Sequence, residues 1–175
     1  TERVLALLAL MLLHDSRRDA RFTDGVLVPL AEQDRRRWDR DRIAEGRALL
    51  DRALAAGARG PYAVQAAIAE LQTEDPVDWR AVVALYDTLH AQTGSPVVAL
   101  NRAVAVAEAD GAGPALALVD TLDLDGYRYF HATRAELLRR LGDVAAARAA
   151  YDRALGLTTT EAERRFLARR RADLG

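Results

Sequence analysis

The chain has 175 residues, of which 50% are hydrophobic and 29% are charged, a composition that predicts one globular domain and argues against a disordered segment. A formal net charge of −1 argues against general attraction to nucleic acid, and the absence of cysteine excludes a disulfide framework, a thiolate nucleophile and a zinc knuckle. The apolar run from Val4 to Leu13 is shorter than the roughly 20 residues that span a bilayer. We therefore expect a cytoplasmic protein without membrane contact and, since the chain does not open with Met, an excerpt of a longer protein.

Helical periodicity runs through almost the whole chain, and no segment shows the sustained alternation of a half-buried strand. The first helix is apolar nearly all round, so it should be buried or capping. Asp78 has the position of an N-cap, and Thr160 with Glu163 has the spacing of a capping box. A long polar connection with a short apolar piece at 26–30 separates the first two helices. The nine expected helices cover 2–14, 39–56, 62–71, 79–91, 96–109, 114–122, 127–141, 144–155 and a last segment that begins at Thr160.

An internal repeat distinguishes a solenoid from a globular bundle. Between Ala135 and Leu155 the sequence matches the tetratricopeptide pattern, with small residues where two helices would cross, Gly142-Asp143 at the turn and Tyr151 in the groove. Similar positions recur one repeat earlier, around 103–122, while 79–89 and 46–53 resemble the second helices of two further repeats. The sequence therefore predicts an all-α, right-handed superhelix (an α-solenoid) of about four tetratricopeptide-like helix pairs plus a capping helix, as a single domain of residues 1–175.

No pattern in the sequence predicts catalysis. His14, His90 and His131 are scattered, and no pair has the spacing of a helical metal site. The chain contains neither a glycine-rich phosphate loop nor a G-x-S-x-G elbow. Carboxylates have an Arg three or four residues away, which is typical of a solvated helix face. We expect neither an enzyme nor a protein with a cofactor or a bound metal.

The polar segment from His14 to Trp38 is dense in side chains that make bidentate hydrogen bonds. It could dock an anionic partner or a neighbouring domain, because the arginine guanidinium forms bidentate hydrogen bonds with carboxylates and phosphates. It could instead form an internal Asp–Arg lattice that pins the long first connection onto the helices. The alternating acids favour a protein contact over a phosphate backbone. The candidate contact residues in this segment are His14, Asp15, Arg17, Arg18, Arg21, Gln33, Asp34, Arg35 and Trp38.

Asn101 and its neighbour Arg102 complete the candidate contact residues. Asn101 lies in the middle of an expected helix, where asparagine is mildly unfavourable. It shares a face with Val97 and Val104, so we expect it to be half-buried and hydrogen-bonded. It would either tie one helix pair to the next or line the concave groove.

Several blocks of this sequence resemble a known family over essentially its whole length. They are 5–21, Gln33-Asp34-Arg35-x-x-Trp38, 60–69, Asp78-Trp79, Leu85-Tyr86 and 101–105. Together they are similar to the C-terminal tetratricopeptide-like extension of extracytoplasmic-function (ECF) RNA polymerase sigma factors. Residues 14–21 and 33–38 match polar motifs of that family and carry over as candidate contacts only. Where the family often has Glu-Asp-Gln-Asp, this chain has Ala31-Glu32-Gln33-Asp34, so the first acid is absent.

The resemblance implies a parent protein whose N-terminal sigma regions contact promoter DNA and polymerase. Those regions are absent from this chain, so DNA contact belongs to them. The extension would dock to the sigma regions, to core RNA polymerase or to a signalling partner, and would be needed for activity or control. Two alternatives are a free-standing adaptor that binds peptide termini and a small-molecule sensor with a pocket inside the superhelix. A solvent-lined pocket that holds Asn101 and converging arginines would favour the sensor.

Overall fold

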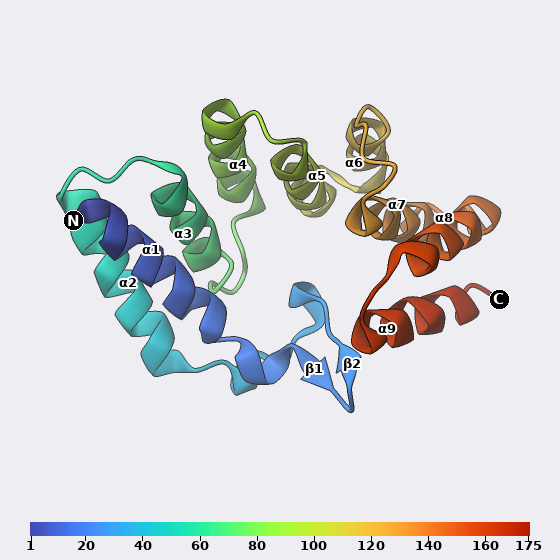
Figure 1. Cartoon of the computed structure of the whole chain (residues 1–175), viewed down its shortest axis with the longest axis horizontal. Coiled ribbons are helices and arrows are strands. Elements are labelled where there is room, and N and C mark those ends of the chain that lie inside the picture. Colours follow the sequence, from blue (N-terminus) through green and yellow to red (C-terminus); the bar gives the residue numbers. More distant parts are fainter.

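The computed structural model describes residues 1–175 as a curved row of nine α-helices (Figure 1). The predicted all-α, solenoid-like fold is confirmed. None of the helices combines the length and the apolar character that crossing a bilayer requires. The helices are α1 (Glu2–Asp15), α2 (Arg40–Ala55), α3 (Pro61–Leu71), α4 (Trp79–Thr93), α5 (Pro96–Asp110), α6 (Ala112–Val119), α7 (Arg128–Arg140), α8 (Val144–Leu157) and α9 (Glu161–Ala172).

The helices pack mainly on their neighbours in the chain, as four pairs with α9 against the last pair. The hydrophobic core is correspondingly divided into clusters that follow one another along the sequence. One cluster joins Ala9 and Trp38 to Ala66, another gathers residues from Leu100 to Leu137, and a third extends from Ala135 to Leu167. Each pair therefore buries its apolar face against the next, which is the organisation of a repeat protein.

The repeat positions lie where the sequence predicts them. Ala135, Ala147 and Ala154 are fully buried at the contact between α7 and α8, where small side chains let the two helices approach. Tyr151 is also fully buried, and its hydroxyl donates to the Glu136 carboxylate at 2.5 Å. Gly142 adopts a left-handed φ of 80° in the turn between the helices, a conformation that favours glycine.

Two predicted helix caps are present, one of them only in part. The Asp78 carboxylate accepts from the backbone N–H of Ala81 at the start of α4. The Thr160 hydroxyl accepts from the backbone N–H of Glu163 at 3.3 Å, as the capping-box spacing predicts. The Glu163 carboxylate, however, binds Arg128 and Tyr129 on α7 and does not return to Thr160. The expected box is thus half formed, because a tertiary partner takes its acid.

The connection between α1 and α2 contains a small β-hairpin that the sequence did not predict. Its strands are β1 (Phe22–Thr23) and β2 (Val26–Leu27), paired antiparallel with Phe22 opposite Leu27. Asp24 and Gly25 form the turn, both with positive φ (52° and 75°), as the Asp-Gly pair of a tight hairpin turn requires. Strands of two residues are too short to show alternation. Three short 3₁₀ turns complete the connection: η1 (Arg18–Ala20), η2 (Leu30–Glu32) and η3 (Arg35–Arg37).

This first connection also reaches the last helix of the chain. Strand β2 packs against α9, and Glu32 of η2 forms an ion pair with Arg170 of α9. In Figure 1 the hairpin lies beside α9, so the connection bridges the two arms of the curved row. The connection therefore bridges the concave side of the solenoid at one place.

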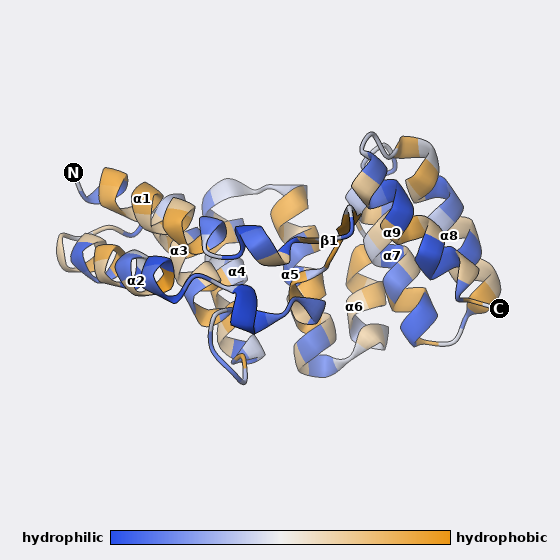
Figure 2. Ribbon diagram, turned by 90° about the horizontal axis from the view of Figure 1, so that it is seen from below, coloured by the Kyte–Doolittle hydropathy of each residue, from blue (hydrophilic) through white to orange (hydrophobic).

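Helix α1 belongs to the pair at the opposite end of the row, packs against both α2 and α3, and leaves one side uncovered. Ala6, Ala9 and Leu13 are buried against the next helices. Leu8 and Met11, by contrast, are 43% and 57% exposed. The hydrophobic colouring of α1 in Figure 2 is continuous over much of its length. The expectation of a buried or capping helix is thus met only in part, since α1 is buried on one side and exposed on the other.

Candidate functional site

The concave side of the solenoid holds two adjoining hollows. The larger, of about 550 Å³, lies between α5, α7, α9 and η2. The smaller, of about 420 Å³, lies between the end of α1, helices α3 and α4, the start of α5 and the connection. Leu30, Gln72, Tyr86 and Asn101 line both, so the two hollows share a wall.

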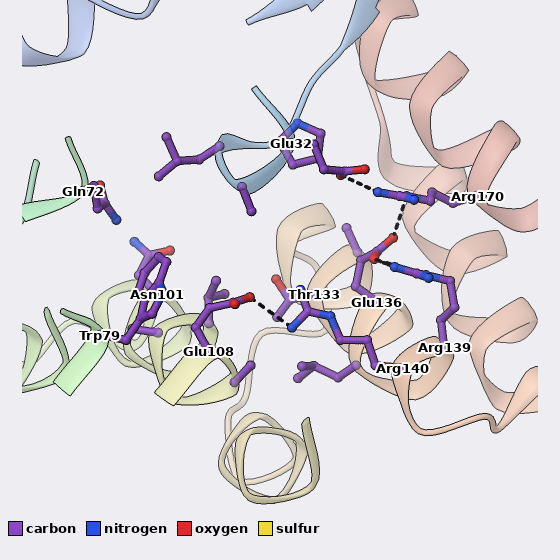
Figure 3. Close-up of a pocket in the computed structure, with 18 of the residues that line it drawn as sticks. Glu32, Gln72, Trp79, Asn101, Glu108, Thr133, Glu136, Arg139, Arg140 and Arg170 are labelled. Atoms are coloured by element: carbon purple, nitrogen blue, oxygen red, sulfur yellow. Dashed lines mark hydrogen bonds and ion pairs between the residues drawn. The ribbon is translucent and has the colours of Figure 1, made fainter. Parts of the chain in front are cut away.

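Glu136 of α7 organises the charges of the larger hollow (Figure 3). Its carboxylate accepts from the Tyr151 hydroxyl and from Arg139 Nη2, the latter at 2.7 Å. Arg170 Nε lies 3.3 Å from the same carboxylate, and the Arg170 guanidinium also pairs with Glu32. This network joins α7, α8, α9 and the first connection at one place.

The remaining charges of the larger hollow are paired as well. Arg140 Nη1 lies 3.1 Å from Glu108 Oε1, which joins α7 to α5. Between the charged groups the wall is apolar, with Trp79, Val104 and Phe166 among its residues. The larger hollow therefore combines an apolar surface with charges that neutralise one another.

The smaller hollow has a different electrostatic character. Arg17 and Arg21 line it together with His14, and no carboxylate does. Arg21 donates to the backbone carbonyl of His14 at 2.7 Å. The half-buried guanidinium of Arg17 forms no hydrogen bond or ion pair within the chain. Positive charge is therefore left without a counter-ion on this side of the concave surface.

The pKa values of two groups reflect this concentration of positive charge. Burial, followed by the nearby charge of Arg21, lowers the pKa of Arg17 to about 10, so that it stays charged at neutral pH. Partial desolvation, followed by the charges of Arg17 and Arg21, lowers the pKa of His14 to about 4. His14 is exposed as a whole residue, so its two cationic neighbours have a substantial part in this shift. The imidazole is neutral at pH 7.

Other predicted contact residues bind within the chain. Asp15 pairs with Arg18 and with Arg42 of α2, so it joins the end of α1 to the start of the next helix. Asp34 accepts from both the side chain and the backbone of Arg36, which lowers the pKa of its carboxyl. These pairs hold the connection in shape, as the internal-lattice reading of this segment expects.

Arg35, Gln33 and Trp38 make a second set of internal contacts. The Arg35 guanidinium donates to the backbone carbonyls that end α3, at 3.2 Å and 3.4 Å, and lies over the Trp38 ring with 4.5 Å to its centre. The Trp38 indole N–H donates to the Gln33 side chain at 3.2 Å. Trp38 itself is buried. This group pins the second half of the connection onto α3.

Asn101 and Arg102 lie in different surroundings although they are neighbours in sequence. Asn101 is exposed and lines both hollows, and in Figure 3 no interaction joins it to the other residues drawn. The expectation of a half-buried, hydrogen-bonded Asn101 is wrong, because the curvature leaves this face of α5 open. Arg102 instead ties one helix pair to the next, with Arg102 Nε 2.5 Å from Asp87 Oδ1 on α4.

The structure thus brings His14, Arg17, Arg21, Gln33 and Asn101 to one hollow. The other candidates (Asp15, Arg18, Asp34, Arg35, Trp38 and Arg102) do not line either hollow. Sequence reasoning missed Gln65, Gln72, Tyr86, Glu136 and Arg170. Gln65 and Tyr86 stand in blocks that carry the family resemblance, which is a usable signal. The sequence gives no such signal for Gln72, Glu136 and Arg170, because their spacing is that of ordinary helix-surface residues. No group of three or more His, Asp or Glu side chains has an arrangement that could hold a metal ion.

Comparisons with known proteins match the N-terminal part of the chain to a family model and most of the chain to one relative. A model described as a family of unknown function (DUF6596) matches residues 1–54. A protein of Rhizobium meliloti (strain 1021), named as uncharacterized, is 43% identical over 171 residues, which cover 94% of this chain. The chain spans 40% of the length of that relative. No solved structure matches.

Proposed function

We propose that this chain is the regulatory, protein-interaction domain of an ECF-type RNA polymerase sigma factor, and that it docks to the sigma regions or to core polymerase. The sequence blocks that resemble the sigma-factor extensions support this role. The Rhizobium meliloti relative leaves room for it, since about 60% of that protein lies outside the match. A helical solenoid offers the extended surface that such a role uses.

The observation that carries the proposal is the uncovered side of α1. Val4, Leu8 and Met11 recur at helical spacing and are 53%, 43% and 57% exposed. A patch of contiguous apolar residues on a protein surface often marks a site where another protein binds. Helix α1 belongs to the pair at one end of the helical row, where a further folded region can pack without disturbing the pairs already formed (Figure 1). The proposed occupant of this face is a sigma region of the parent protein.

The test is a transcription assay with the full-length parent protein. Replacing both Leu8 and Met11 by Gln keeps α1 helical but removes the apolar contact. We expect promoter-dependent transcription to fall about tenfold or more, as for an interface that loses two central apolar anchors. The melting temperature of the isolated chain should stay within about 2 °C of the wild-type value, because both side chains are already largely exposed.

The matched control lies at a different helical junction. Leu141 and Val144 are 49% and 39% exposed between α7 and α8, and their double Gln variant should transcribe normally. Unchanged transcription from the Leu8/Met11 variant would contradict the proposed docking face. An equal loss of transcription in the Leu141/Val144 variant would also contradict it, because that loss would reflect a general effect of adding polar residues to the surface. If the variant instead abolishes self-association of the isolated chain, the occupant is a second copy and the proposal is wrong.

A further inference from the structure

The smaller hollow contains positive charge that the fold does not neutralise. Each arginine that lines the larger hollow has a carboxylate oxygen within 3.3 Å. Arg17 and Arg21, which line the smaller hollow, form no ion pair with a carboxylate. Arg21 donates one hydrogen bond, to the His14 backbone carbonyl, and the Arg17 guanidinium donates none. A partly buried guanidinium without a carboxylate is a place where an anion can bind, because burial has already removed part of the water around its charge.

Neutral polar side chains converge on the same hollow. The Tyr86 hydroxyl and the side-chain amides of Gln65, Gln72 and Asn101 line it and have no hydrogen-bonding partner in the chain. Gln65 lies on α3, Gln72 directly follows that helix, Tyr86 lies on α4 and Asn101 on α5. Gln65, Gln72 and Tyr86 are half-buried and Asn101 is exposed, so their polar groups are free to bind a molecule that lies beside the two arginines.

The size and position of the hollow limit what that molecule can be. The first connection crosses the concave side and is fastened to α9 by β2 and by the pair between Glu32 and Arg170. Volumes of about 420 and 550 Å³ are those of ordinary small-molecule pockets. Leu30, Gln72, Tyr86 and Asn101 line both hollows, so the apolar surface of the larger hollow, with Trp79 and Val104, adjoins the cationic smaller one.

From this arrangement we infer that the concave side binds a small organic anion, with its carboxylate or phosphate at Arg17 and Arg21 and its apolar part in the larger hollow. The Tyr86 hydroxyl and the Asn101 amide would bind the remaining oxygens of the anion. Arginine suits both head groups, because its planar fork matches two oxygens at once. Anion binding goes beyond the docking role proposed above. It is tested on the chain alone, so the docking proposal and the anion-binding inference can fail independently.

The depressed pKa values of the site agree with this reading. The pKa of Arg17 is lowered by burial and by Arg21, and that of His14 by partial desolvation and the same arginines. An anion between the two arginines would offset their charge. The His14 imidazole should therefore take up a proton more readily when the site is filled, which gives a spectroscopic signal that a purely structural arginine would not produce.

The test is a titration of the chain with three probes that share a phenyl ring: phenyl phosphate, benzoate and the uncharged benzyl alcohol. Heteronuclear NMR follows the Asn101 side-chain amide and the His14 ring. We expect phenyl phosphate, benzoate or both to shift the Asn101 amide saturably and to raise the His14 titration midpoint, with benzyl alcohol inactive. The two anions also separate a phosphate ligand from a carboxylate ligand.

Two variants of adjacent residues complete the experiment. Arg17→Gln should weaken binding of the active probe about tenfold or more, since it removes a charge-assisted contact. Arg18→Gln is the matched control: Arg18 is 72% exposed, pairs with Asp15 and does not line the hollow. It should bind like the wild type. Binding of neither anion at millimolar concentration, or equal affinity of Arg17→Gln and wild type, would overturn the inference. Circular dichroism of each variant establishes that it is folded.

Discussion

Replacing Gly46 by Ala tests the close approach of α1 and α2, which holds the start of the connection in place. A Cβ at this position would lie 2.8 Å from Leu13 Cγ and 3.1 Å from Leu13 Cδ2. Leu13 is only 1% exposed within a packed cluster, and its Cγ is not a freely moving end of the side chain. The helices must therefore separate or Leu13 must leave its rotamer.

Two opposing effects set the expected magnitude. Overpacking a buried contact costs about 1–3 kcal/mol, whereas Ala in place of Gly in a helix gains about 0.5–1 kcal/mol. We expect Gly46→Ala to lower the free energy of unfolding by about 1–2 kcal/mol and the melting temperature by about 3–6 °C for a domain of this size. Thermal and urea unfolding followed by circular dichroism measure both quantities.

Gly156 provides the matched control for this substitution. It lies in α8, and a Cβ there would meet nothing within 4 Å. Gly156→Ala should therefore stabilise the chain by about 0.5–1 kcal/mol. Adding Leu13→Val to Gly46→Ala should recover part of the loss, since the two residues contact each other. A Gly46→Ala protein as stable as the wild type would refute the reasoning, as would equal losses at both glycines.

Two further predictions concern the connection. The pKa of His14 is about 4 in the folded chain against 6.5 when unfolded, because partial desolvation and then Arg17 and Arg21 disfavour its charged form. The unfolded state therefore binds this proton more readily, so the free energy of unfolding should fall as pH drops from about 6.5 to 4. His14→Gln should flatten this part of the pH dependence measured by urea unfolding. An unchanged pH dependence in the variant would contradict the prediction. Glu32→Gln should change the unfolding free energy by less than about 1 kcal/mol, since exposed ion pairs contribute little. It should nevertheless speed proteolytic cleavage within the β1–β2 hairpin, because the link to Arg170 is weakened; wild-type cleavage rates would show that the pair does not hold the connection.

The repeat architecture could be predicted from sequence because its determinants are local. Helix periodicity, caps such as Asp78 and the small residues that meet at Ala135 and Ala147 act within one helix pair. Each pair packs chiefly on the next, so no long-range information is needed to recognise the solenoid. The hairpin was missed although Asp24-Gly25 is a strong turn signal, because its strands are too short for a periodic pattern.

The candidate site depends on contacts between residues that are far apart in the chain. From the sequence alone, Arg17, Arg18 and Arg35 are equivalent members of one polar segment. Tertiary packing gives Arg18 a carboxylate, gives Arg35 the carbonyls that end α3, and leaves Arg17 in a hollow without a counter-ion. The pairing of Glu32 with Arg170 likewise arises only when the row curves enough to bring α9 to the connection. Helix content follows from local periodicity, whereas the balance of charge on the concave side follows from that curvature.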